Sequence, residues 1–142
     1  MAVIAAAALD LYTKVQGVSA LNLSAGLTVG GQVPDPGMTK IPLPGAWILL
    51  ENGETTLDPS SRVVSLNLTG RLTYVVLLAV PYTSQTDLLD VQFPLVEEVI
   101  DAVHGKAAPS GMRWLWNKLK LLVVNGDRLV YRIEFVLDAG SM

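Results

Sequence analysis

The pattern of apolar residues points to one strand around which the chain is organised. Residues 74–80 read Tyr-Val-Val-Leu-Leu-Ala-Val, carry no charged side chain and are followed by Pro81. An uncharged run of this length is typical of a strand that is buried on both faces of a sheet. We therefore expect residues 71–80 to form a central strand, with neighbouring strands and covering layers supplied by the rest of the chain.

The N-terminal segment has the spacing of a helix. Residues 3–16 contain a run of alanines, which are strong helix formers, and Gly17 is a suitable residue to end the helix. The apolar side chains recur at roughly three- and four-residue steps, and the expected buried stripe consists of Ile4, Leu9, Leu11, Tyr12 and Val15. This helix is long enough to cover one face of the central strand.

A second amphipathic helix is predicted before residue 104. Pro94 suits the first position of a helix, so we expect the helix to run from there to Val103 and to be closed by Gly105. Asp87 or Asp90 is available as a cap upstream. The apolar face holds Val96, Val99, Ile100 and Val103, and the face turned to water holds Glu97, Glu98 and Asp101.

The remaining strands are marked by alternation and by turn residues. Residues 46–50 form an expected strand that ends at an Asn52-Gly53 turn. After a turn at residues 58–61, residues 62–68 alternate as a strand does, and Gly70 is the expected bend before the central strand.

The C-terminal part predicts a hairpin. Residues 119–124 and 128–137 are expected to pair about Asn125-Gly126-Asp127, which is the strongest turn signal in the chain. The returning strand has one apolar side, made of Leu129, Tyr131, Ile133, Phe135 and Leu137.

Residues 18–45 differ in character, because glycine and proline are frequent there. Apolar residues alternate with small or polar ones, as in a strand or an extended arm: Leu21, Leu23, Leu27, Val29 and Val33. A connection this long is unusual inside a compact domain. Two interpretations stay open, a loosely held hairpin and an arm that reaches onto a neighbouring subunit.

The order of these elements predicts an α+β fold. We expect a single domain over residues 1–142, with one mostly antiparallel β-sheet, two main helices packed on it and a long Gly/Pro-rich arm at about 18–45.

Composition adds an expectation about partners. Of the 142 residues, 51% are hydrophobic and only 16% are charged, against about 25% charged in a typical soluble domain. No run approaches the roughly 18 apolar residues that cross a bilayer, and the N-terminus lacks the features of a signal peptide. We therefore expect the surplus apolar surface to contact another copy or another protein, and we expect no membrane partner.

Charge and residue types exclude several kinds of chemistry. The net charge is -3 and there is no cysteine, which argues against a groove that grips nucleic acid and excludes thiolate sites. The single histidine, His104, follows Asp101 by one turn, but such a pair is more often a solvated helix end than a metal site. No nucleophile elbow or phosphate loop occurs. We expect no enzymatic activity, no cofactor and no metal.

Several local stretches carry a family resemblance when they are taken in order. They are an N-terminal helix of small residues, the lead Pro42-Leu43-Pro44-Gly45 into residues 46–50, the strand entered through Arg71, the helix that ends at His104-Gly105 with Pro109 soon after, and the closing strand 129–135. In this order the chain resembles the tail terminator, or tail-completion, proteins of tailed bacteriophages. The resemblance covers most of residues 3–137.

The resemblance implies a structural virion protein. Such subunits form a ring, expected to be a hexamer, that caps the tail tube, ends its polymerisation and joins the tail to the head connector. The implied partners are copies of the chain itself, the tail tube protein, head-tail connector or neck proteins and, in contractile tails, the sheath protein. DNA would pass through the lumen without specific binding. The implied location is the tail-neck junction of the virion, after assembly in the host cytoplasm.

Two other interpretations stay open. One is another neck or tail component, such as a head-tail connector, stopper or tube subunit, and the other is a small ligand-binding α+β domain with a deep apolar pocket. Tryptophan and arginine concentrate in protein interfaces. The interface residues expected on this ground are Trp47, Trp114 and Trp116, with Arg71 and Arg113 at the rim.

Overall fold

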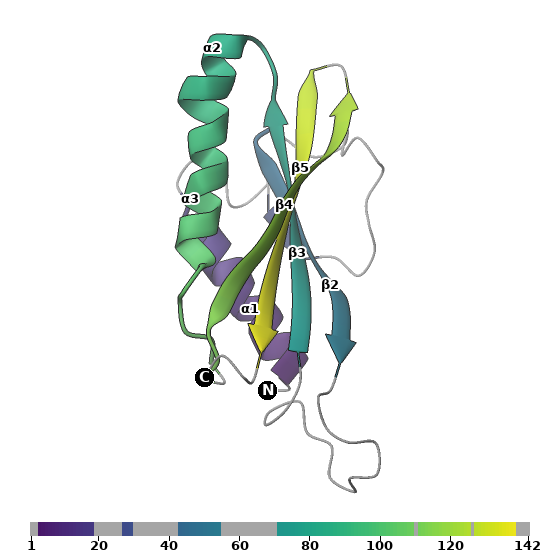
Figure 1. Ribbon diagram of the computed structural model, residues 1–142, viewed down its shortest axis with the longest axis vertical. Coiled ribbons are helices and arrows are strands. Elements are labelled where there is room, and N and C mark those ends of the chain that lie inside the picture. The colour runs from purple at the N-terminus through teal and green to yellow at the C-terminus, as the bar shows by residue number, and fades with distance from the viewer. Residues whose placement is uncertain are drawn as a thin grey trace, which may run out of the picture.

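One five-stranded sheet carries the helices of this protein. The computed structural model describes residues 3–18, 27–29, 43–54, 71–109, 111–125 and 127–138. The elements are α1 (Val3–Gln16), β1 (Leu27–Val29), β2 (Gly45–Glu54), β3 (Arg71–Pro81), α2 (Gln85–Asp87), the π-helical turn η1 (Leu88–Gln92), α3 (Phe93–Val103), β4 (Trp114–Asn125) and β5 (Arg128–Asp138). The described strands lie in the order β1-β2-β3-β5-β4, and among their pairs β1–β2 is parallel and the others are antiparallel. Strands β2 to β5 are labelled in Figure 1. The predicted α+β class, a mostly antiparallel sheet with two main helices, is confirmed.

The central strand β3 is buried on both faces, as predicted. It pairs with β2 on one side and with β5 on the other, and residues 72–80 are all buried. Successive side chains enter two different clusters because strand side chains alternate between faces. The larger cluster takes Tyr74, Val76, Leu78 and Val80, and the smaller one on the opposite face takes Val75, Leu77 and Ala79.

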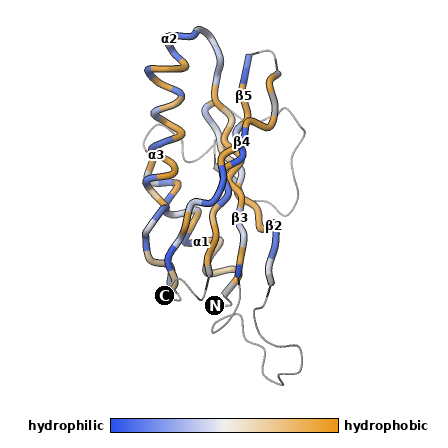
Figure 2. Tube along the Cα trace, in the orientation of Figure 1, coloured by the Kyte–Doolittle hydropathy of each residue, from blue (hydrophilic) through white to orange (hydrophobic). Residues whose placement is uncertain are grey.

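Both α1 and α3 pack on the face of the larger cluster. The helix α1 contributes Ala7, Leu11 and Val15, which follow one another at four-residue steps. Ile4 and Leu9, which were expected in the buried stripe, are exposed instead. Ala7, which was not expected in that stripe, is buried instead. In Figure 2, hydrophobic and hydrophilic segments recur along α3, and its buried residues are Leu95, Val96, Val99 and Val103, as expected of an amphipathic helix.

The second helical run begins earlier than predicted. Ser84 is the N-cap, and its side-chain oxygen accepts a hydrogen bond from the backbone N–H of Asp87 at 3.1 Å, so neither Asp87 nor Asp90 acts as the cap. Pro94 does lie in the first turn of α3, directly after the π-helical turn, in which the Phe93 N–H bonds to the Leu88 carbonyl. A proline ring would clash with the carbonyl four residues earlier in a regular α-helix, and the wider π turn lies at the point of that clash.

The C-terminal end of this helix agrees with the prediction. The helix ends at Val103, and Gly105 follows with a φ of +78°, a left-handed conformation that favours glycine.

The predicted turn at Asn52-Gly53 is wrong, because both residues lie inside β2. The pairing of β2 with β3 continues as far as Glu54 opposite Arg71. The register shifts between Leu50 and Asn52, so the chain makes a β-bulge there in place of a turn. Continued pairing along the 11 residues of β3 overrides the local turn signal.

The predicted hairpin is confirmed, although its first strand is longer than expected. Asn125 pairs with Arg128 across the connection. The strand β4 begins at Trp114, before the predicted start at Leu119, and two irregularities, at Trp116/Lys118 and Leu121/Val123, divide it. These bulges interrupt the alternation that the sequence pattern depends on.

Some sequence predictions lie outside the described residues. These are the turn at 58–61, the strand at 62–68, the bend at Gly70 and most of the arm at 18–45. Of the arm, residues 27–29 form β1, which pairs with β2 of the same chain.

Candidate protein interface

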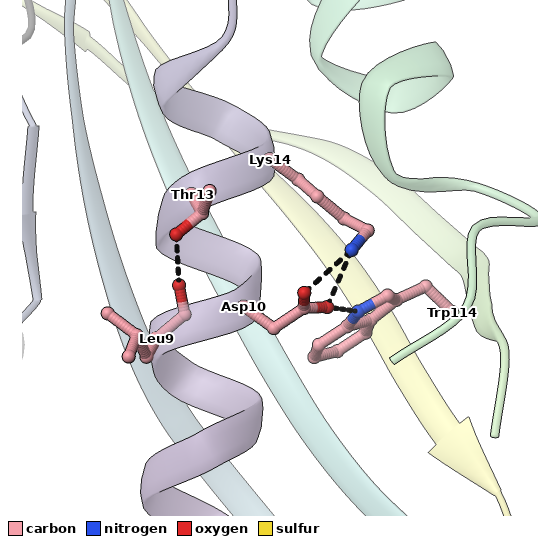
Figure 3. A network of polar contacts seen from close by, with 5 residues as sticks. All are labelled: Leu9, Asp10, Thr13, Lys14 and Trp114. Atoms are coloured by element: carbon pink, nitrogen blue, oxygen red, sulfur yellow. Dashed lines mark hydrogen bonds and ion pairs between the residues drawn. The ribbon is translucent and has the colours of Figure 1, made fainter. Parts of the chain in front are cut away.

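Trp114 is buried in the core of its own chain. Its ring packs edge-on against Tyr74, with ring centroids 5.6 Å apart and planes at 76°. Its Nε1–H donates a hydrogen bond to Asp10 Oδ2 at 2.7 Å. Lys14 Nζ donates to both oxygens of the same carboxylate at 2.7 and 2.8 Å (Figure 3). Trp114 therefore ties α1 to β4 and presents no surface to a partner.

The other residues expected at an interface do not gather into one patch. Trp47 pairs with Leu77, on the sheet face opposite the helices, whereas Trp116 pairs with Phe135, on the helix face. Trp116 is 42% exposed, and Trp47 is partly buried.

The two arginines expected at the rim differ in exposure and in their hydrogen bonds within the chain. Arg113 is exposed and donates a hydrogen bond from its guanidinium to the Gly105 carbonyl at 2.8 Å. Arg71 is partly buried, and its Nε has no hydrogen-bond partner among the described residues. Arg71 pairs with Glu54, at the other end of β2 from the Trp47–Leu77 pair.

The most prominent exposed surface is instead the edge strand β4. Beyond the buried Trp114, six of its large apolar side chains are exposed, on both faces of the sheet: Leu115, Trp116, Leu119, Leu121, Leu122 and Val124. The charged residues along it are Lys118 and Lys120, both exposed. A long apolar edge strand pairs readily with another chain unless it is covered. The sequence shows that β4 has apolar residues on both of its sides, but it does not show that β4 lies at the edge of the sheet.

The first part of the β4 edge is closed by the connection from α3. Gly105 N–H donates to the Trp114 carbonyl at 2.8 Å, and Trp114 N–H donates to the Lys106 carbonyl at 2.9 Å. Trp116 N–H donates to Nδ1 of His104 at 3.0 Å, so the single histidine serves to cover a strand edge. Within the described residues, such hydrogen bonds to the outer edge of β4 stop at Trp116. No other described segment forms backbone hydrogen bonds with the outer edge of β4 from Lys118 onward.

Two hollows border this open stretch. One, of about 290 Å³, separates α3 from β4 and is lined by Phe93, Val96, Glu97, Ile100, Trp116, Leu119 and Tyr131. The other, of about 570 Å³, is lined by Lys118, Leu119, Lys120, Leu122 and Arg132. The strand thus has an apolar groove on its helix side and a basic hollow beside its lysines.

A polar network next to the basic hollow fixes Arg132. Its guanidinium forms ion pairs with Glu51 and with Glu134, and Asn117 also donates a hydrogen bond to Glu134. Burial alone would raise the pKa of Glu134, but the hydrogen bonds from Asn117 and Arg132 and the nearby positive charges outweigh burial and lower it below the ordinary value of 4.5. The network spans β2, β5 and β4, and we interpret it as a set of structural contacts that stabilise the sheet.

The helical run from Gln85 to Val103 is the acidic counterpart of β4. It contains no lysine or arginine, and its five acidic side chains are all exposed: Asp87, Asp90, Glu97, Glu98 and Asp101. Exposed apolar side chains accompany them: Leu89, Val91 and Phe93. The predicted solvent-facing position of the α3 acids is confirmed. The molecule thus has two mixed apolar and charged surfaces of opposite sign.

The described residues offer no arrangement for metal chemistry. Across them, no group of three or more histidine, aspartate or glutamate side chains is placed to hold a metal ion. No helix in the same part of the chain has both the length and the apolar character needed to cross a membrane.

Comparison with known proteins shows similarity at the level of structure. No protein-family model matches the sequence, and no curated protein is similar to it. A chain from the virion of a native gene transfer agent (GTA) particle is similar with a TM-score of 0.59 at 18% identity, over 96% of this chain and 96% of that one. A second solved chain is similar with a TM-score of 0.51 at 9% identity, over 96% of this chain and 92% of that one. At these identities the likeness shows a shared fold, which extends over nearly the whole chain.

Proposed function

We propose that this chain is a structural virion protein of a tailed, phage-like particle, and more narrowly a tail terminator. The observation that carries the proposal is the shared fold with a chain of a gene transfer agent virion over 96% of both chains. The order of elements and the local stretches that resemble tail terminators point the same way. In this role the chain would end the polymerisation of the tail tube and join the finished tail to the head.

The exposed surface is consistent with a subunit that works in an assembly. A closed ring is built from heterologous contacts, in which each subunit uses two different surfaces. The apolar strand β4 and the acidic helical run are two such surfaces on one chain. We expect the ring to be a hexamer, with the tail tube on one side and neck proteins on the other.

Deletion of the gene, followed by electron microscopy of the particles, tests the role. Loss of a tail terminator is expected to give overlong or headless tails, and a plasmid copy of the wild-type gene should restore normal ones. Filled heads that leak DNA would indicate a stopper or connector instead. Particles of normal length, yield and infectivity or gene transfer would contradict both.

A further inference from the structure

We propose that β4 of one copy binds the acidic outer side of the α2–α3 helical run of a second copy, so that copies join head to tail. The inference rests on the proposed ring subunit for its biological setting. The contact itself is argued from the two surfaces of this chain.

The strand surface needs a partner along its second half. Beyond Trp116, the outer edge of β4 makes no backbone hydrogen bonds within the described residues, whereas its first part is closed by residues 104–106. Leu121 and Val124 on this half are 45% and 68% exposed. An exposed edge with large apolar side chains is stabilised when another chain covers it.

The charges of β4 favour an acidic partner. Lys118 and Lys120 are exposed and border the basic hollow of about 570 Å³. Glu98 and Asp101 are exposed on the side of α3 that faces away from its buried residues, and Leu89 and Val91 are exposed earlier in the same helical run. The helical surface thus offers carboxylates and apolar side chains to a strand that offers lysines and apolar side chains.

The same charges argue against symmetric contacts. Two β4 strands side by side would bring the lysine pairs of both copies together, and two helical runs would bring their carboxylates together. Like charges placed opposite one another are destabilising. A head-to-tail contact pairs opposite charges at every junction.

The two surfaces are separate enough for one copy to use both at once. In Figure 1, α3 stands along one side of the sheet, while the end of β4 at the hairpin lies away from it, beyond the other strands. A heterologous contact of this kind leads to a ring when the rotation between copies closes.

Charge reversal followed by mixing tests the contact. One variant carries Lys118→Glu and Lys120→Glu, and the other carries Glu98→Lys and Asp101→Lys, with circular dichroism to verify folding. Each alone places like charges at the contact, and we expect its self-association in sedimentation equilibrium to be weakened at least about tenfold. An equimolar mixture should regain wild-type association, because every helix–strand contact then pairs opposite charges. The matched control Lys106→Glu reverses an exposed lysine outside the contact and should associate as wild type does.

Cross-linking gives a second measurement that does not depend on the reversed charges. The chain has no cysteine, so Leu121→Cys and Val91→Cys introduce the only thiols. At high protein concentration, a short bismaleimide should join the two variants when they are mixed and should join neither variant to itself. A dimer of Leu121→Cys alone would overturn the proposal in favour of strand-to-strand pairing. A mixture that yields neither a mixed cross-link nor charge-dependent association would also overturn it.

The outcomes separate this inference from the proposed function. If the chain is found in purified particles but the cross-links join like surfaces, the inference fails and the virion role stands. If the mixed cross-link forms but the chain is absent from particles, the virion role fails and the contact stands.

Discussion

The hydrogen bond between Trp114 and Asp10 ties α1 to the sheet, as does the bond that the Tyr74 hydroxyl donates to the Ile4 carbonyl at 2.6 Å. Removal of the Trp114–Asp10 bond gives a quantitative prediction. The indole N–H of a fully buried tryptophan donates to the Asp10 carboxylate at 2.7 Å, and Lys14 donates to both oxygens of that carboxylate. Asp10→Ala removes the acceptor and leaves a buried donor with no partner.

The magnitude follows from these two interactions. A buried polar group left without a hydrogen bond costs about 1–3 kcal/mol. Loss of the i,i+4 ion pair with Lys14 adds about 0.3–0.5 kcal/mol. The side chains of Asp10 and Lys14 are 17% and 19% exposed, so water retains some access and the lower half of the range applies. We expect Asp10→Ala to lower the free energy of unfolding by about 2 kcal/mol.

Urea unfolding followed by far-UV circular dichroism measures this change, with the m-value compared between variants. Asp10→Asn is the matched control, because its amide oxygen still accepts from the indole N–H while the ion pair is lost. We expect it to lose less than about 1 kcal/mol. If Asp10→Ala and Asp10→Asn are equally stable within about 0.5 kcal/mol, the hydrogen bond does not anchor α1 and the reasoning is wrong.

Three further predictions concern ionisation and backbone conformation. Burial raises the pKa of Tyr74 to about 12, so its contribution to stability is complete below the ordinary pKa of 10.0 and is lost as the pH rises through 12. Absorbance at 295 nm should show a tyrosine ionisation near pH 12, and Tyr74→Phe should remove that step. Because the pKa of Glu134 is lowered, its contribution is present above pH 4.5 and is lost as the pH falls through the lower folded-state pKa. Glu134→Gln should therefore flatten the acid side of the stability curve, whereas Glu98→Gln at an exposed position should follow wild type. Gly105→Ala should lower the free energy of unfolding in urea by about 1 kcal/mol, because the φ of +78° strains any other residue. No atom lies within 4 Å of the added Cβ, so steric contact does not contribute. An unchanged stability would contradict the left-handed conformation.

The sequence predicted the elements that are defined by local periodicity. The first helix, the two-sided burial of β3 and the apolar side of β5 follow from the spacing of their own side chains, and all three are confirmed. Errors arose where something other than local periodicity decides the outcome. The turn signal at Asn52-Gly53 gave way to pairing with β3, and the early start of the second helical run depends on the Ser84 cap and a π turn that no periodicity reveals.

The candidate interface was harder to predict, because residue type does not determine location. Trp114 and Trp116 are two residues apart on an exposed edge strand, and yet one is fully buried and the other is 42% exposed. Side chains two apart in a strand point to the same face, so the difference comes from what lies above each: α1 covers Trp114 through Asp10, and Trp116 faces the groove beside α3. The position of β4 at the edge of the sheet depends on the topology, and only the structure shows it.

The most direct test of the central claim is electron cryomicroscopy of the tailed particles produced from the genome that encodes this chain. We expect copies of the chain to form a ring at the junction of tail tube and neck, with β4 of each copy against the α2–α3 run of the next. Absence of the chain from the particles, or a ring in which β4 faces solvent, would contradict the account.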